Sequence, residues 1–222
     1  MILTIESHNR HHFPDLIDQM FRMRAEVFSG RLGWDVAVTN GREIDRFDEE
    51  DPAYLLSVKE KTGALQGAVR LLPTTGPNML RDVFSTLVPG GAPESPLIWE
   101  SSRFAINPRI FPGDDRAMAN HRVNGITLEL LCGIVEVCQK SGIDQIVSVF
   151  DARIARIFRA VDCPYDEIGT PTRIGKVMTY AGLFAMSDAM WRRLATVAGF
   201  DAPVLARPDA MTRLATVAKK AA

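Results

Sequence analysis

The stretch Leu97-Ile98-Trp99-Glu100-Ser101-Ser102-Arg103-Phe104-Ala105-Ile106 organises the chain, and its pattern predicts a central β-strand. The run is apolar at both ends and is bounded by Pro96 and by Asn107-Pro108, as is typical of a strand that crosses a core. Its middle is charged and hydroxylic. An unpaired buried carboxylate or guanidinium costs several kcal/mol, so this strand needs complementary charges or a ligand. The stretch therefore indicates either a chemical site or a structural ion-pair network.

Side chains alternate across a strand, which predicts two distinct faces for this one. One face is expected to carry Trp99, Ser101 and Arg103, and the other Glu100, Ser102 and Phe104. Polar groups would then point to both sides of the sheet, and each side would need its own partners.

The composition is that of a globular chain with a full core, with 222 residues, 46% of them hydrophobic, and a net charge of -1. This length predicts a single domain over residues 1–222, with a loosely attached tail from about residue 203. The small net charge argues against nucleic acid or an anionic membrane surface as a partner. No stretch approaches about eighteen consecutive apolar residues, and the N-terminus has no signal-peptide pattern. We therefore expect no membrane span and a cytoplasmic location.

Cysteine and histidine usage argues against a disulfide or a metal site. The cysteines are Cys132, Cys138 and Cys163. The first two point in different directions from one predicted helix, so reduced, packed thiols are expected. The N-terminal segment carries His8, His11 and His12. No carboxylate or cysteine completes a metal-ligand spacing around them, so we predict no bound metal.

Periodicity predicts helices and strands in alternation. The expected helices span 14–28, 79–87, 116–140, 152–161 and 189–198. The expected strands span 54–58, 65–72, 97–106, 143–150 and 177–186. Such an order places the chain in the α/β class, as a mixed sheet flanked by helices.

Two arginines lie in apolar surroundings, Arg24 in the first helix and Arg70 in the second strand of a hairpin. Composition favours a snorkelling side chain at Arg24, with its charge in solvent. The segment 30–52 has no clear periodicity and is long for a connection, which suggests a functional segment containing Trp34, Asp45 and Asp48. The alternative is a mobile surface excursion whose acids are solvated.

Several of these features form an ordered series of short motifs. They are Phe21-Arg22-Met23-Arg24-Ala25-Glu26-Val27-Phe28, Trp34, Asp45-Arg46-Phe47-Asp48, Arg70-Leu71-Leu72-Pro73-Thr74, Met79-Leu80, Phe84 and Glu100-Ser101-Ser102-Arg103-Phe104. In this order and spacing the chain resembles the acyl-homoserine lactone synthase (autoinducer synthase) family, over about half its length. The resemblance implies a fold similar to the GNAT acyltransferases. It also implies synthesis of a quorum-sensing signal from S-adenosylmethionine and an acyl thioester on acyl carrier protein or coenzyme A, with release of methylthioadenosine. S-adenosylmethionine is then a substrate, and no cofactor is expected.

The reaction implied by the resemblance needs a base. The α-amine of S-adenosylmethionine has an ordinary pKa near roughly 8, so at neutral pH it is mostly protonated and cannot attack a thioester. Glu100 is the candidate base, acting directly or through one water. The expected substrate-binding residues are Arg24, Phe28, Trp34, Asp45, Asp48, Arg70, Phe84, Ser102 and Arg103. Among them, the two aspartates can pair with the three arginines and shape the pocket.

The acyl chain is expected to bind against the second half of the chain. The residues assigned to this pocket are Phe104, Ile126, Leu130, Ser148 and Phe150. In the family, a threonine near Ser148 is associated with 3-oxo acyl donors, which implies that Ser148→Ala shifts donor preference several-fold. The alternative is a hydroxyl bonded to backbone.

Two other functions compete with this one. A GNAT-type N-acyltransferase acting on another amine would need a pyrophosphate loop, and Arg109-Ile110-Phe111-Pro112-Gly113-Asp114 departs from the usual Arg/Gln-x-x-Gly-x-Gly/Ala pattern. A ligand-binding module would need no base. Finally, Arg153, Arg156 and Arg159 form a basic stripe on one predicted helix, which is either a docking face for an acidic acyl carrier protein or a solvated helix face.

Overall fold

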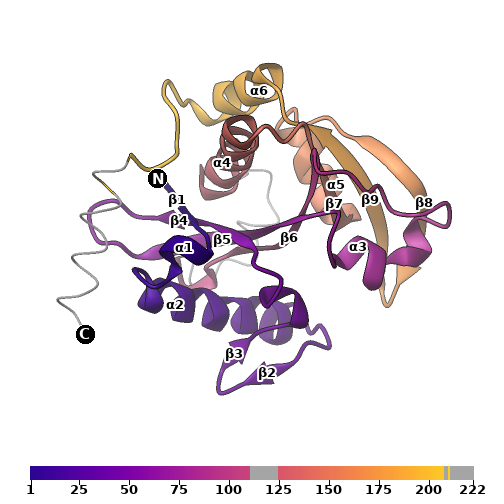
Figure 1. Ribbon diagram of the computed structural model, residues 1–222, viewed down its shortest axis with the longest axis horizontal. Helices are drawn as coiled ribbons and strands as arrows, with labels where there is room; N and C mark the ends of the chain where they lie inside the picture. Colours follow the sequence, from indigo (N-terminus) through magenta and orange to yellow (C-terminus); the bar gives the residue numbers. More distant parts are fainter. Residues whose placement is uncertain (111–124, 208–209, 211–222) are drawn as a thin grey trace.

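The computed structural model describes residues 1–110, 125–207 and 210, and these form one seven-stranded sheet with helices on both sides (Figure 1). The strand order is β1-β4-β5-β6-β7-β9-β8. In that order the strands are Ile2–Ile5, Ala53–Val58, Leu65–Pro73, Ile98–Ile106, Gln145–Asp151, Val177–Ala185 and Asp166–Ile174. The strand predicted to be central, β6, is the fourth of the seven.

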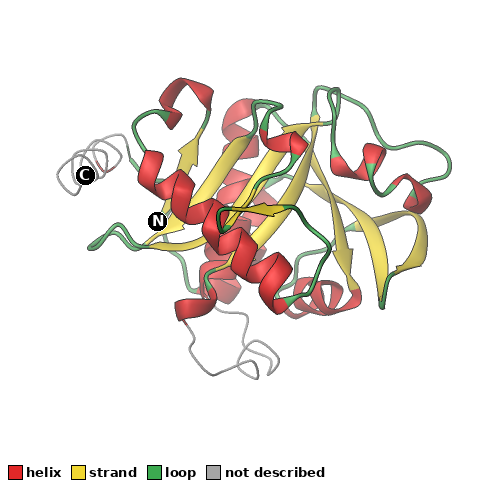
Figure 2. Cartoon of the chain, turned by 90° about the horizontal axis from the view of Figure 1, so that it is seen from below, coloured by secondary structure: helices red, strands yellow, loops and turns green. Residues whose placement is uncertain are grey.

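The helices cover the two faces of the sheet differently. Helices α4 (Gly125–Ser141), α5 (Ala152–Ala160) and α6 (Asp188–Ala198) pack on one face, which we call the α4 face. Helix α2 (Pro14–Arg24) crosses the other face, the α2 face, as Figure 2 shows. The short helix α3 (Met79–Asp82) and the 3-10 turn η3 (Ser85–Leu87) also pack there, beside β7 and β9. No helix among the described residues is both long and apolar enough to cross a bilayer.

Strand β6 joins the two halves of the sheet. It pairs antiparallel with β5 and parallel with β7, whereas the other neighbouring strands of the sheet pair antiparallel. The parallel pairing runs from Ile98 opposite Gln145 to Ser101 opposite Ser148. Strand β6 therefore continues beyond the part that pairs with β7. Its two charged residues, Glu100 and Arg103, lie on either side of the last paired residue, Ser101.

A β-bulge in β6 corrects the predicted division of its side chains. Ala68 pairs with Ala105 and Arg70 with Ser102, so one residue of β5 lies opposite two residues of β6. Arg103 absorbs the extra residue with a φ of 55°. Because an inserted residue interrupts the alternation, Arg103 lies with Ser102 on the α2 face, and Phe104 turns to the α4 face. The strict alternation predicted from the sequence is wrong from Arg103 onward.

Other element boundaries also differ from prediction. The helix expected over 14–28 changes at Ala25 into a π-helix, η1 (Ala25–Arg31), and the helix expected over 79–87 is divided into α3 and η3. Part of the long helix, 116–124, lies outside the described residues. The strands β1 and β8 were not predicted, nor were the helix α1 (Ser7–Arg10), the hairpin β2 (Val38–Thr39) and β3 (Arg42–Glu43), or the 3-10 turns η2 (Arg46–Asp48) and η4 (Pro108–Ile110).

Residues 204–206 are held to the sheet, so the predicted loose attachment from about residue 203 is wrong for them. The amide of Ile2 donates to the Val204 carbonyl at 2.8 Å, and Ala206 donates to the Ile2 carbonyl at 2.7 Å. The buried carboxylate of Glu136 accepts from the amides of Val204 and Leu205. A buried carboxylate needs such donors, so this segment and Glu136 stabilise each other.

The three cysteines are free and buried, as predicted. Burial raises the pKa of each thiol to about 12. Thiols of this kind are inert packing groups.

Candidate active site

Six charged side chains gather on the α2 face of the sheet and pair with one another. Three are arginines and three are acids, so their formal charges cancel. They are Arg24, Arg70, Arg103, Glu43, Asp45 and Asp48. We call this set the arginine–acid network. Its side chains are at most 8% exposed except that of Asp45, at 17%. Charges at this depth are tolerated only because each is paired and hydrogen-bonded.

Local structure explains why these charges meet. Arg24 is the last residue of α2, Arg70 points to the same face from β5, and the β6 bulge adds Arg103. Two of the acids belong to one turn, η2, where the side chains of Asp45 and Asp48 form a reciprocal capping box. Such a box fixes both carboxylates at the start of a helical turn, so the pair reaches the arginines as one unit.

Asp48 is the most heavily bonded acid of the network. It accepts from both terminal nitrogens of Arg24, at 2.8 and 2.9 Å, from Arg70 at 2.9 Å and from the Tyr54 hydroxyl at 2.8 Å. Burial alone would raise the pKa of Asp48, but the bidentate bond and charge of Arg24, with the charge of Arg70, hold it well below its ordinary value. Asp48 therefore stays ionised and serves to brace two arginines.

Arg24 is 1% exposed, so the expectation that it snorkels to solvent is wrong. Desolvation opposes its charge, yet its bonds to Asp48 and Glu43 hold the pKa of Arg24 above its ordinary value. The predicted pairing of the two aspartates with the arginines is confirmed.

Glu43 was not identified from the sequence, although it is central to the network. Its side chain is fully buried, accepts from Arg24 at 2.5 Å and from Arg103 Nε at 3.1 Å, and lies 3.0 Å from a terminal nitrogen of Arg103 as an ion pair. The sequence signal for it is the balance of charges. Arg24, Arg70 and Arg103 together need three acids as partners, and only Asp45 and Asp48 were assigned.

Asp45 and Arg103 form the edge of the network nearest to solvent. Asp45 accepts from Arg70 at 2.5 and 3.1 Å and forms an ion pair with Arg103 at 2.8 Å. Among the described residues, one terminal nitrogen of Arg103 donates only to the Met79 thioether, at 3.3 Å. Because a thioether is a weak acceptor, this guanidinium keeps the capacity to bind an anion.

Glu100 lies beside the network but is held differently. Its two carboxylate oxygens accept from the backbone amides of Met79 at 3.0 Å and Leu80 at 2.6 Å, at the start of α3. The side chain is buried, and desolvation raises the pKa of Glu100, against the opposing effects of the two amides, of the charge of Arg70 and of Ser102. A carboxylate with a raised pKa is suited to accept a proton near neutral pH.

An aromatic stack borders the network. The rings of Phe28 and Trp34 are stacked with centroids 5.2 Å apart, and the guanidinium of Arg103 lies 5.3 Å from the Phe28 ring centroid. Phe28 is buried between these neighbours, whereas Trp34 is 45% exposed. Phe84 lies on the same face, packed against the clusters that contain Leu80 and Met79. The structure thus places all the predicted substrate-binding residues around one part of the α2 face.

The predicted acyl-pocket residues lie across the sheet, on the α4 face. Leu130 and Phe150 are buried, and Phe104 and Ile126 are partly buried against the same cluster. Phe150 contacts four other rings, those of Phe158, Tyr165, Tyr180 and Phe184. The Ser148 hydroxyl donates to the Ser101 carbonyl at 3.0 Å, a backbone partner on the neighbouring strand. The five residues share a face, but packing alone accounts for their burial.

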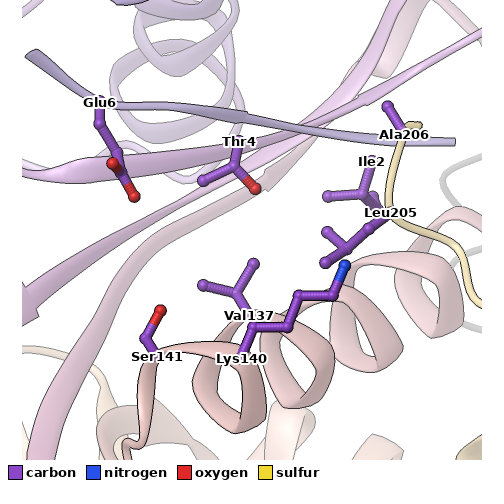
Figure 3. A pocket seen from close by; sticks show the side chains of 8 residues that line it. All are labelled: Ile2, Thr4, Glu6, Val137, Lys140, Ser141, Leu205 and Ala206. Carbon is purple, nitrogen blue, oxygen red and sulfur yellow. The ribbon is translucent and has the colours of Figure 1, made fainter. Parts of the chain in front are cut away.

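Two pockets on the described surface lie away from Glu100. The first, of about 210 Å³, is at the far edge of the sheet, between β1, the end of α4 near Lys140 and residues 205–206 (Figure 3). The second, of about 450 Å³, lies at the end of α5 and includes Phe158 and Arg159. Neither contains a residue of the arginine–acid network. Over the described ranges there is also no cluster of three metal-ligating side chains.

Comparison with known proteins gives a family match. A family model described as autoinducer synthase matches residues 7–194. The acyl-homoserine-lactone synthase of Agrobacterium fabrum is 36% identical over 195 residues, which is 87% of this chain and 90% of that protein. The isovaleryl-homoserine lactone synthase of Bradyrhizobium diazoefficiens is 31% identical over 199 residues, covering 89% and 79% of the two chains.

Solved structures give the same result. The structure of a CoA-dependent acyl-homoserine lactone synthase, BjaI, with S-adenosylmethionine and isopentyl-CoA superposes with a TM-score of 0.80. It is 29% identical and covers 96% of this chain and 98% of its own. The synthase LasI superposes with a TM-score of 0.74 at 29% identity, over 88% and 94% of the two chains.

Proposed function

Because this chain belongs to the autoinducer synthase family, we propose that it is an acyl-homoserine lactone synthase whose base is Glu100. It makes a quorum-sensing signal from S-adenosylmethionine and an acyl thioester, and it releases methylthioadenosine. The observation that carries the assignment of residues is the position of Glu100, a buried carboxylate of raised pKa beside a charge-balanced arginine–acid network.

Charge balance supports this assignment. The six charges of the network cancel, so Glu100 contributes an unbalanced negative charge. S-adenosylmethionine with a protonated amine carries two positive charges and one negative charge. Its binding would neutralise the site, and transfer of the ammonium proton to Glu100 leaves substrate and carboxyl both uncharged overall. A buried site favours such neutral combinations.

The exposed edge of the network suggests which groups meet the substrate. We assign Arg103 to the substrate carboxylate, because among the described residues one of its nitrogens has only a thioether as partner. We assign Asp45, the most exposed acid, to the substrate ammonium. Glu43 and Asp48 are instead paired with the buried arginines that they hold in position. The exposed Trp34 ring offers an aromatic face to the sulfonium.

The reaction proceeds in two steps. The free amine attacks the thioester carbonyl, the carbon–sulfur bond breaks, and the thiol leaves with a proton. The substrate carboxylate then attacks its own γ-carbon, which closes the lactone and expels methylthioadenosine as a neutral thioether. The second step is intramolecular with a good leaving group, so it needs position more than an added base.

Product analysis tests the function directly. Purified protein incubated with S-adenosylmethionine and a panel of acyl thioesters should release acylated lactone and methylthioadenosine in equal amounts, as measured by mass spectrometry. A GNAT-type acyltransferase acting on another amine would release thiol without methylthioadenosine. Part of the loop that bears on that alternative, residues 111–114, lies outside the described residues. A cytoplasmic location stays a prediction.

The geometry of Ser148 changes the expected effect of Ser148→Ala. Because the hydroxyl proton is committed to the Ser101 carbonyl, the hydroxyl can donate to a 3-oxo group only by giving up that bond. The ratio of kcat/KM for 3-oxo and unsubstituted donors of one length should therefore stay within about twofold. Ser148→Thr, which keeps the hydroxyl, is the matched control. A several-fold loss confined to the alanine variant would show that the hydroxyl turns to the substrate.

The basic stripe on α5 predicts a donor-dependent effect. Arg156 and Arg159 are exposed and Arg153 is half-buried. Reversing all three charges to glutamate should raise KM for an acidic acyl carrier protein by roughly tenfold at low salt, because the stripe would increase the rate at which the two proteins associate. The dependence of this KM on salt should become weaker. KM for an acyl-CoA should not change.

A single reversal on another helix controls for a charge reversal placed away from the stripe. Arg192 is exposed on α6, and Arg192→Glu should leave both donors unaffected. Equal effects of the stripe variant on both donors would mean that α5 presents an ordinary solvated face.

A further inference from the structure

The position of Glu100 depends on a segment outside its own strand. Its carboxylate is held by the amides of Met79 and Leu80. A displacement of α3 would therefore also displace the proposed proton acceptor. Helix α3 has only four residues, and its N-cap is Asn78, whose side chain accepts from the Arg81 amide. So short a helix is not stable alone and takes its position from what packs against it.

Helix α3 packs against strands β7 and β9 of the sheet. Leu80 and Leu87 are fully buried in one cluster with Val147 of β7 and Ala181 of β9. The backbone continues from α3 into η3, where the Phe84 amide donates to the Met79 carbonyl at 2.9 Å. Helix α3 and η3 therefore form one packed, hydrogen-bonded segment.

Gly169 of β8 is where that segment touches the backbone of the sheet. The pairing of β8 with β9 shifts between Ile168 and Thr172, and Gly169 has a φ of 69°. A Cβ added at this residue would lie 1.9 Å from the Leu87 carbonyl oxygen and 3.0 Å from Val88 Cγ1. Only a residue without a side chain permits this contact.

We propose that Gly169 is a positioning residue for the reaction: its bare backbone, against the Leu87 carbonyl, sets where α3 presents its two amides to Glu100. This rests on the proposed role of Glu100 as base. Gly169 touches no reacting group and acts through η3 and α3. Strand β8, at the edge of the sheet, thereby determines the position of the Glu100 carboxylate on β6.

The surroundings of Glu100 give the sign of the effect. The amides of Met79 and Leu80 and the charge of Arg70 from β5 favour its ionised form, and Ser102 on its own strand does so too. From β7, the residue paired with Glu100 is the apolar Val147. Withdrawing the amides therefore favours the protonated carboxyl. The acid limb of the rate profile would move to higher pH.

Gly169→Ala is the direct test, with Gly175→Ala as its matched control. Gly175, in the turn between β8 and β9, also has a positive φ, 58°, but a Cβ there meets nothing within 4 Å. Both variants carry the backbone strain of alanine at positive φ, and only the first displaces Leu87. The expected result is that Gly169→Ala speeds hydrogen exchange at the Met79 and Leu80 amides at least about tenfold and lowers kcat up to about 10²-fold, with KM for S-adenosylmethionine nearly unchanged.

A second variant covers the case in which Gly169→Ala does not fold. Leu87→Ala loosens the packing of η3 by removing a buried side chain, and Leu194→Ala removes one of matching burial from α6. Exchange at the two amides and the acid limb should change in the first and not in the second. Unchanged amide exchange in Gly169→Ala, or equal changes in both leucine variants, would overturn the positioning role. Faster exchange without any shift of the acid limb would instead count against Glu100 as base.

Discussion

Glu100→Gln is expected to lower kcat for lactone formation by about 10²–10⁴-fold, the usual contribution of a positioned base. The amide cannot take the ammonium proton. It also has one oxygen where two backbone amides require two acceptors, so one of the Met79 and Leu80 bonds is lost. Such a loss costs about 1–3 kcal/mol of stability, so thermal unfolding must be measured beside turnover.

The dependence on pH separates the two effects of this substitution. The pKa of Glu100 is raised, so wild-type kcat/KM should fall toward acid with a midpoint above the ordinary value of 4.5. In Glu100→Gln this limb should disappear, and the residual rate should rise with pH through roughly 8, as free amine replaces ammonium. A residual rate that is low but independent of pH would mean that Glu100 only holds α3 in place. Near-normal turnover at neutral pH would remove it from the mechanism.

Glu43→Gln is expected to destabilise the fold by about 3–5 kcal/mol, because it leaves the buried network with three positive charges and only two negative ones. Glu43 is fully buried and bonds to both Arg24 and Arg103. For a chain of this length the loss corresponds to a fall in Tm of roughly 6–20 °C. Thermal unfolding followed by circular dichroism measures it.

An acid on the outer side of helix α2 provides the comparison. Asp18 pairs with Arg22 and Arg42 near the surface, where solvent screens the interactions, so Asp18→Asn should keep a Tm close to that of the wild type. The double variant Glu43→Gln, Arg103→Met should recover part of the lost stability, since it removes the unpaired charge. Equal Tm values for Glu43→Gln and Asp18→Asn would contradict the importance of the network for the fold.

The sequence predicted the elements that have strong periodicity. The long helix, the central strand and the last helix were located because their apolar residues recur at helical or strand spacing. Strand β1 was missed, since four residues beside a histidine-rich segment give too little pattern. Strand β8 was missed because its residues are largely exposed and Gly169 and Pro171 interrupt it.

The sequence identified most residues of the site, but it did not predict how their side chains are arranged. The arginines and aspartates were named correctly as partners, but the side of the sheet that Arg103 occupies depends on a bulge. A bulge depends on pairing with another strand, which alternation in one strand cannot reveal. Glu43 was missed because it belongs to a two-residue strand without periodicity, and its burial follows from long-range packing.

The contact between Ile2 and Val204 has a consequence for biosynthesis. The first strand of the sheet to leave the ribosome receives its outer hydrogen bonds from a segment made about two hundred residues later. Until then the outer edge of β1 stays open to pairing with another chain, and closing so long a loop is slow. Glu136, already in place on α4, can capture the arriving amides of Val204 and Leu205. Translation therefore has to pass residue 206 before the fold is sealed.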